Sequence, residues 1–66
     1  MISERIKELR QRVYTQAEFA RAVGVVRSTV NGWESGRRTP DIGTLMRIAK
    51  ALDVKVGDLL EEEVKS

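Results

Sequence analysis

The stretch GVVRSTVNGWESGRR, residues 24–38, decides the fold, because it has the pattern of a short helix enclosed by two glycines. Val30 and Trp33 are three residues apart, which places them on one side of such a helix and predicts that this side belongs to the core. The opposite side carries Arg27, Ser28, Asn31 and Gly32. It therefore has the polar groups of a binding surface and, at the glycine, one position without a side chain.

The composition limits what the chain can be. Its 66 residues allow one small domain, which we expect to span residues 1–66. The sequence has no cysteine and no histidine, which excludes disulfides, thiolate or imidazole zinc sites and Cys or His nucleophiles. We expect no metal and no cofactor. No apolar run is long enough for a signal peptide or a membrane span, so we expect a soluble cytoplasmic protein.

The charge is unevenly distributed along the chain. Residues 1–40 hold eight Lys and Arg against four Asp and Glu, a balance of +4, whereas residues 41–66 hold four against six, a balance of −2. A basic first part joined to a mildly acidic second part indicates one face for a polyanion and another that is turned away from it. Ordinary solvated charge is the alternative reading of the same numbers.

Four apolar stripes with helical spacing flank or follow the opening stretch. They consist of Ile2, Ile6, Leu9 and Val13; Phe19, Ala20 and Val23; Ile42, Leu45, Ile48, Ala49 and Leu52; and Val56, Leu59 and Leu60. Ser3, Thr15 and Asp41 are placed to cap the first, second and fourth helices, and Glu18 completes a capping box with Thr15. The first helix is expected over residues 3–12 and the second from Gln16 to just before Gly24. No segment alternates with a period of two, so the fold class predicted is a compact, all-α bundle of five helices.

Several spaced motifs occur together between residues 5 and 60. They are Thr15-Gln16 with Phe19-Ala20, Val23-Gly24-Val25, Ser28-Thr29-Val30, Trp33-Glu34-Ser35-Gly36, Pro40, and Thr44-Leu45 with Ala49-Lys50-Ala51-Leu52. With these residues the chain resembles the phage-repressor-like (xenobiotic-response-element type) helix-turn-helix domain. The resemblance implies a lambda-repressor-like five-helix fold in which residues 15–36 form the helix-turn-helix. It also implies that the third helix lies in the DNA major groove and that the second crosses the backbone.

Three residues are candidates for base contact, namely Arg27, Ser28 and Asn31. The first two stand at the N-terminal end of the third helix, which is the end that enters a groove. An arginine can donate two hydrogen bonds to guanine O6 and N7, and an asparagine can pair with adenine N6 and N7. The alternatives are a phosphate contact or a merely solvated side chain for Arg27, and a place along the groove wall for Asn31.

Five residues are candidates for contact with the DNA backbone. The resemblance places Gln16 at the phosphate-facing start of the second helix, and Ser35, Arg37 and Arg38 in the turn after the third. Val26 stands where the family usually has a capping Ser or Thr that also reaches a phosphate, so a cap worth about 1 kcal/mol is lost. The valine either packs or contacts a thymine methyl group.

Gly32 departs from the family pattern, because relatives often present a base-reading side chain at this position. A glycine inside a helix costs about 0.5–1 kcal/mol and has nothing with which to read a base. Two explanations remain open. Either the backbone approaches the DNA more closely, or the protein reads fewer bases per half-site.

The sequence therefore predicts a small transcriptional regulator, a repressor, that binds a specific double-stranded operator and resides with the nucleoid. No enzyme is expected, because we assign the carboxylates to caps and solvated faces, and no small-molecule ligand is expected. The alternative is an antitoxin-like or adaptor module that binds another protein with the same fold. We further expect a homodimer on a pseudo-palindrome, with Val56, Leu60 and Val64 at its interface and the acidic tail 61–66 turned away from the DNA.

Overall fold

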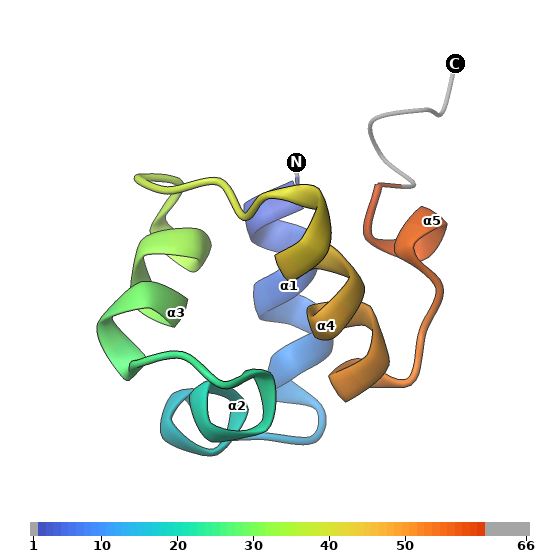
Figure 1. Cartoon of the computed structure of the whole chain (residues 1–66). Helices are drawn as coiled ribbons and strands as arrows, with labels where there is room; N and C mark the ends of the chain where they lie inside the picture. The colour runs from blue at the N-terminus through green and yellow to red at the C-terminus, as the bar shows by residue number, and fades with distance from the viewer. Residues whose placement is uncertain (1, 61–66) are drawn as a thin grey trace.

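A computed structural model describes residues 2–60, which form five α-helices and contain no strand. The helices are α1 (Ile2–Gln11), α2 (Gln16–Val23), α3 (Arg27–Ser35), α4 (Ile42–Leu52) and α5 (Val56–Leu59). In the view of Figure 1, α1 runs through the middle with α3 and α4 on either side, and α2 closes one end. The all-α class and the five helices are confirmed.

The two ends of α2 follow from local chemistry. Thr15 Oγ1 accepts the backbone N–H of Glu18 at 3.1 Å, and the Glu18 carboxylate accepts the N–H of Thr15 at 2.8 Å, which is the expected capping box. Gly24 ends the helix at φ 87° and ψ 35°, in the left-handed region that glycine enters without strain. Gly36 ends α3 in the same way, at φ 81°. α2 thus runs from Gln16 to just before Gly24, as the sequence predicts, and α3 ends before its own glycine.

The first helix differs from the expectation. It already begins at Ile2, so Ser3 lies inside the helix and does not cap it. It ends at Gln11, after which the N–H groups of Val13 and Tyr14 both turn back to the carbonyl of Arg10. Val13 therefore lies beyond the helix and is 64% exposed, which makes its assignment to the apolar stripe wrong.

The fourth helix is capped as expected, because Asp41 Oδ1 accepts the N–H of Thr44 at 2.8 Å. Its first residue, Ile42, is nevertheless 66% exposed, so its assignment to the apolar stripe is also wrong. Leu45, Ile48 and Ala49 are buried and hold this helix to the core. The short α5 begins after Lys55, whose N–H donates to the carboxylate of Asp58 at 3.0 Å.

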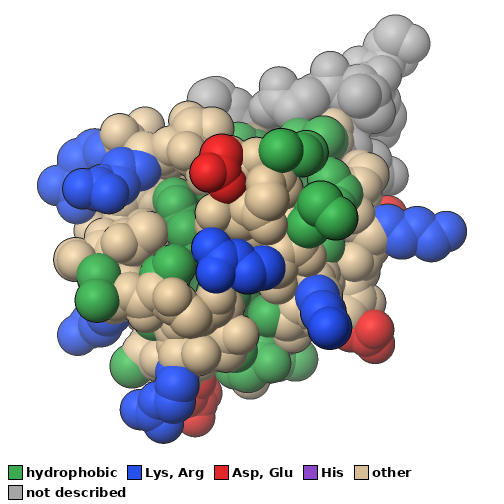
Figure 2. All heavy atoms as spheres, viewed as in Figure 1, with side chains coloured by type: hydrophobic (Ala, Val, Ile, Leu, Met, Phe, Trp, Pro, Cys, Tyr) green, Lys and Arg blue, Asp and Glu red, His purple; other side chains and the backbone are tan. Residues whose placement is uncertain are grey.

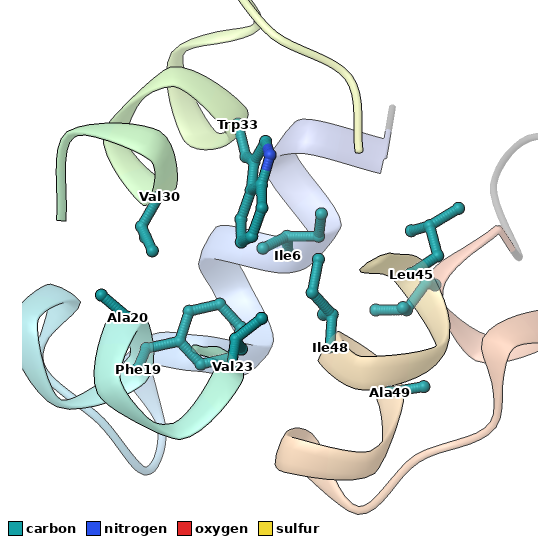
Figure 3. Close-up of a cluster of buried hydrophobic side chains, with 10 residues drawn as sticks. Ile6, Phe19, Ala20, Val23, Val30, Trp33, Leu45, Ile48 and Ala49 are labelled. Carbon is teal, nitrogen blue, oxygen red and sulfur yellow. The ribbon is translucent and has the colours of Figure 1, made fainter. Parts of the chain in front are cut away.

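Side chains from all five helices form one core. Its buried apolar members are Ile6, Phe19, Ala20, Val23, Val30, Trp33, Leu45, Ile48, Ala49 and Leu59. Figure 3 shows the Trp33 ring pointing from α3 toward Ile6 and the side chains of α2. Its centroid lies 6.5 Å from that of Phe19 in an edge-to-face arrangement, a geometry worth about 0.5–1.5 kcal/mol beyond the buried area. The core position of Val30 and Trp33 is confirmed.

A buried ion pair joins α1 to α3. Arg10 Nε and Nη2 donate to the two carboxylate oxygens of Glu34 at 2.8 and 2.7 Å, and Nη1 donates to the carbonyl of Tyr14 at 3.2 Å. The Arg10 and Glu34 side chains are only 10% and 4% exposed. The expectation that caps and solvated faces account for the carboxylates is therefore wrong for Glu34, which lies inside the protein because its charge is neutralised there.

The environment of Glu34 holds its pKa below the ordinary value. Burial alone would raise the pKa, because it disfavours the charged form. The hydrogen bonds from Arg10 and Gln16, together with the positive charges of Arg10 and Lys7, outweigh that effect. The carboxylate consequently stays ionised below the pH at which an unfolded glutamate takes up its proton.

We predict that acid removes the stabilisation due to this ion pair. Because the folded pKa of Glu34 is lower than the unfolded value of about 4.3, the contribution is fully present above the unfolded pKa and is lost as pH falls through the folded one. Glu34→Gln leaves Arg10 uncompensated and should cost about 3–5 kcal/mol at pH 7. Urea unfolding at several pH values should show the gap between wild type and variant narrowing below about pH 4.

The control for this prediction is Glu8→Gln, because Glu8 forms only an exposed pair with Arg5 and Arg12. That substitution should change the free energy of unfolding by less than about 1 kcal/mol. Asp41, whose pKa is lowered by the Thr44 backbone N–H, titrates equally in all three proteins and cancels from the differences. A gap between wild type and Glu34→Gln that stayed constant with pH would contradict the prediction.

Candidate nucleic-acid interface

One shallow groove collects five of the residues that the sequence singles out. It is lined by Gln16, Arg27, Ser28, Asn31 and Arg37. These residues come from the start of α2, the outer face of α3 and the loop after α3. The fold thus brings together all three proposed base contacts and two of the five proposed backbone contacts.

The helix-turn-helix geometry presents α3 outward. Its core side is fixed by Val30 and Trp33, and Figure 3 shows Val30 pointing from α3 toward Ala20 of α2. Because these residues occupy one side of the helix, Arg27, Ser28 and Asn31 are left exposed on the other. An α-helix with side chains is about 10–12 Å wide and fits the major groove of DNA.

Gln16 connects this surface to the buried ion pair. Its Nε2 donates to Glu34 Oε1 at 3.1 Å, and its Oε1 accepts from Arg27 Nε at 3.4 Å. A hydrogen-bonded chain therefore runs from Arg10 through Glu34 and Gln16 to Arg27. The Gln16 amide has a second N–H, and the residue opens α2, where backbone N–H groups point outward, so contact with a phosphate remains open to it.

Glu34 is not among the functional residues predicted from the sequence, although its spacing contains a signal for an internal role. Arg10 follows Ile6 by four residues, and Glu34 follows Val30 by four. Both therefore lie next to core residues on their helices. Opposite charges on the buried stripes of two helices indicate an internal ion pair.

Arg37 folds back onto α3. Its Nη2 donates to Asn31 Oδ1 at 3.0 Å, and its Nε donates to Ser35 Oγ at 3.1 Å. These two hydrogen bonds connect the loop after α3 to the outer face of that helix. Asn31 can still donate from its amide nitrogen, whereas an adenine N6 would have to share its oxygen with Arg37.

The two apolar or small positions of this region have different surroundings. Val26 begins α3 without a side-chain cap and is 65% exposed, so it does not pack, which leaves the thymine methyl contact open. Gly32 is buried, because the aliphatic part of Arg38 lies over it. The stem of Arg38 therefore covers the gap expected in the face of α3, and the two explanations given for the glycine remain predictions.

Arg38 lies apart from the other proposed contacts. It lines a second groove with Val25 and Thr29 on one side and residues 39–41 and Thr44 on the other. Another cation, Arg47 of α4, lies close to the turn between α2 and α3. Its Nη1 would be 3.9 Å from a β-carbon added to Gly24 in that turn. Figure 2 shows Lys and Arg side chains over the α3–α4 loop and beside the start of α3.

The proposed dimer residues are only partly described. Val56 and Leu60 are half-buried, and Val64 lies outside the described residues. Two large apolar side chains on α4, Ile42 and Met46, are 66% and 60% exposed. They are one turn apart, and Figure 2 shows hydrophobic side chains gathered over the first turns of α4. Among the described residues, no helix is long and apolar enough to cross a membrane.

The order of helices, the glycine-ended α3 and the polar groove over it define a helix-turn-helix domain. Residues 6–59 match the helix-turn-helix family model, and the chain belongs to that family. It is 39% identical over 64 residues to the uncharacterized HTH-type transcriptional regulator YqaE of Bacillus subtilis, covering 96% of this chain and 55% of that protein. The chain thus spans about half the length of that relative.

Two solved structures have the same fold. The master regulator for biofilm formation SinR, in complex with DNA, superposes with a TM-score of 0.83 at 35% identity, covering 91% of this chain and 98% of that one. The P22 c2 repressor protein, in complex with a synthetic operator, gives 0.84 at 28% identity, covering 89% and 91%. The lambda-repressor-like fold that the sequence implied is therefore confirmed.

Proposed function

We propose that this protein is a transcriptional regulator that binds a specific double-stranded operator, and that it acts as a repressor. The observation that carries the proposal is the groove over α3, where Gln16, Arg27, Ser28, Asn31 and Arg37 meet. The similarity to SinR bound to DNA and to the P22 c2 repressor on its operator supports the same function. The protein acts by occupying its site and not by catalysis, and it resides with the nucleoid in the cytoplasm.

The proposed mechanism divides the groove into two functions. Arg27 and Ser28 at the N-terminal end of α3 contact base edges, and Asn31 contacts a base one turn later. Gln16, at the start of α2, and Arg37, in the loop, contact phosphates on either side and fix the register of the helix. Arg27 donates a hydrogen bond to Gln16. The side chain proposed to contact a phosphate therefore positions the side chain proposed to contact a base.

We predict strong salt dependence for binding to DNA. Each phosphate that the protein neutralises releases counterions, so affinity should fall steeply as salt rises. Titration of a random-sequence duplex at two salt concentrations measures the slope, and selection of bound fragments from a random library supplies the operator. Absence of duplex binding at low salt would contradict the proposed function and favour the protein-interaction module.

Arg27→Ala should weaken operator binding by about 1–3 kcal/mol and relax the preference at one base pair per half-site, because a bidentate contact is lost. Arg21→Ala is the control, since Arg21 is an exposed arginine of α2 that does not line the groove. Competition binding with operator and random duplexes measures both effects. An equal loss on the two duplexes would assign Arg27 to a phosphate.

We also propose that the protein binds its operator as a homodimer. One domain presents few base contacts, and helix-turn-helix proteins gain specificity by pairing across a two-fold axis. The surface proposed for pairing lies on α4 and the C-terminal part of the chain, where Ile42 and Met46 are exposed and Val56 and Leu60 are half-buried. Val64 continues the proposed surface in sequence.

The predicted assembly is a dimer whose half-sites are about 10–10.5 base pairs apart, one turn of DNA. Met46→Glu should shift the solution mass toward the monomer, because it places a charge in the apolar contact. Val13→Glu is the matched control, since Val13 is equally exposed but lies between α1 and α2. Light scattering measures the mass in solution, and footprinting shows how many half-sites the protein protects. A monomer in solution that protects a single unrepeated half-site on DNA would contradict the predicted dimer.

A further inference from the structure

Gly32 lies on the outward arc of α3, four residues after Ser28, yet it is buried. A β-carbon added to it would lie 2.9 Å from Cδ and 3.1 Å from Cγ of Arg38. Carbon atoms in ordinary contact are about 3.5–4.0 Å apart, so only a residue without a side chain leaves room for Arg38 here. The stem of Arg38 therefore takes the place that a side chain at position 32 would occupy.

The backbone fixes where Arg38 begins. Gly36 adopts φ 81° and turns the chain back at the end of α3. The carbonyl of Gly32 then accepts the N–H groups of Arg37 and Arg38 at 3.0 and 3.1 Å. The same glycine thus anchors the loop through its carbonyl and receives the Arg38 side chain on its α-carbon.

The two loop arginines line two different grooves of α3. Arg37 lines the groove with Asn31 and Ser28, whereas Arg38 lines the groove with Thr29 and Val25. The stem of Arg38 lies against α3 at Gly32, and its groove extends along α3 to Val25 in the turn before it. That is the end of α3 that enters the major groove in the proposed function.

The guanidinium of Arg38 is available to a ligand. The other two arginines near α3 already have protein partners. Arg27 donates a hydrogen bond to Gln16, and Arg37 donates to Asn31 and Ser35. Within residues 2–60, Arg38 is exposed and its guanidinium has no hydrogen-bond or ion-pair partner. Its stem is held by packing, while its five N–H donors stay open.

We propose that Gly32 is a positioning residue that holds the stem of Arg38 against α3, and that Arg38 reads a base edge in the major groove from there. This inference rests on the proposed function and deepens it. The position of Arg38 in the chain predicts a contact with the DNA backbone from the loop. Its stem instead lies on the outer face of α3 at Gly32. Arg38 therefore provides the base-contacting side chain that a glycine at position 32 cannot provide.

The first test measures the binding of operator and random duplexes to Gly32→Ala, Arg38→Ala and the double variant. Arg38→Ala should lose roughly tenfold or more of its operator affinity, with little loss on random duplex. Gly32→Ala should show a similar loss because its methyl group displaces Arg38, and the double variant should lose little more. Gly57→Ala is the control, since a β-carbon on Gly57 meets nothing within 4 Å.

Arg38→Lys separates the two possible DNA contacts, because lysine keeps the charge and most of the stem but not the planar fork. It should retain binding to random duplex and lose preference for the operator. Equal losses on the two duplexes, or full operator preference in Arg38→Lys, would overturn the assignment of Arg38 to a base. Additive effects of Gly32→Ala and Arg38→Ala would overturn the positioning role of Gly32.

A readout without DNA tests the packing separately. In the Arg38→Ala background, Gly32→Ala should raise the melting temperature, because alanine is the better helix former and nothing then obstructs its methyl group. In the wild-type background the same change should raise it less or lower it. An equal rise in both backgrounds would overturn the seating of Arg38. Failure of the wild-type protein to bind any duplex would instead overturn the proposed function, so the two failures are distinguishable.

Discussion

The buried ion pair of Arg10 and Glu34 is the interaction on which the proposed DNA-binding surface depends. It joins α1 to α3 through two hydrogen bonds of 2.8 and 2.7 Å, in a place where a single unpaired charge would be strongly unfavourable. Because Glu34 stands on α3, the pair fixes the rotation of this helix together with Val30 and Trp33. That rotation decides which residues of α3 face outward.

The same ion pair is connected by hydrogen bonds to side chains at the surface. Gln16 donates to Glu34 and accepts from Arg27, so the first residue of α2 and the first residue of α3 are linked. A side chain held in this way loses less conformational freedom when it binds, which reduces the entropic cost of the proposed contact with DNA. The electrostatics of the interior and the geometry of the exposed groove are therefore one connected system.

Much of this protein can be read from its sequence, because the decisive signals are local. Thr15 with Glu18, Gly24, Gly36 and Asp41 mark helix ends, and backbone geometry requires residues of these types there. Apolar spacing then placed most of the core, including Trp33. Two residues that the apolar spacing assigns to the core are exposed instead, and both lie at the end of a helix. Val13 lies just past α1 and Ile42 opens α4, and a periodic pattern does not reveal which way a terminal residue points.

The sequence by itself determined the five helices, the helix-turn-helix and the residues available to the groove, since these depend on neighbours within one or two turns. Only the tertiary structure decided the partners of those residues. The Arg10 and Glu34 side chains meet across 24 positions, and Arg38 reaches Gly32 only because the chain reverses at Gly36. Such contacts join parts of the chain whose relative position depends on packing, which no local pattern records. In the sequence, Gly32 is therefore only a position without a side chain on α3. In the fold, the stem of Arg38 packs over it.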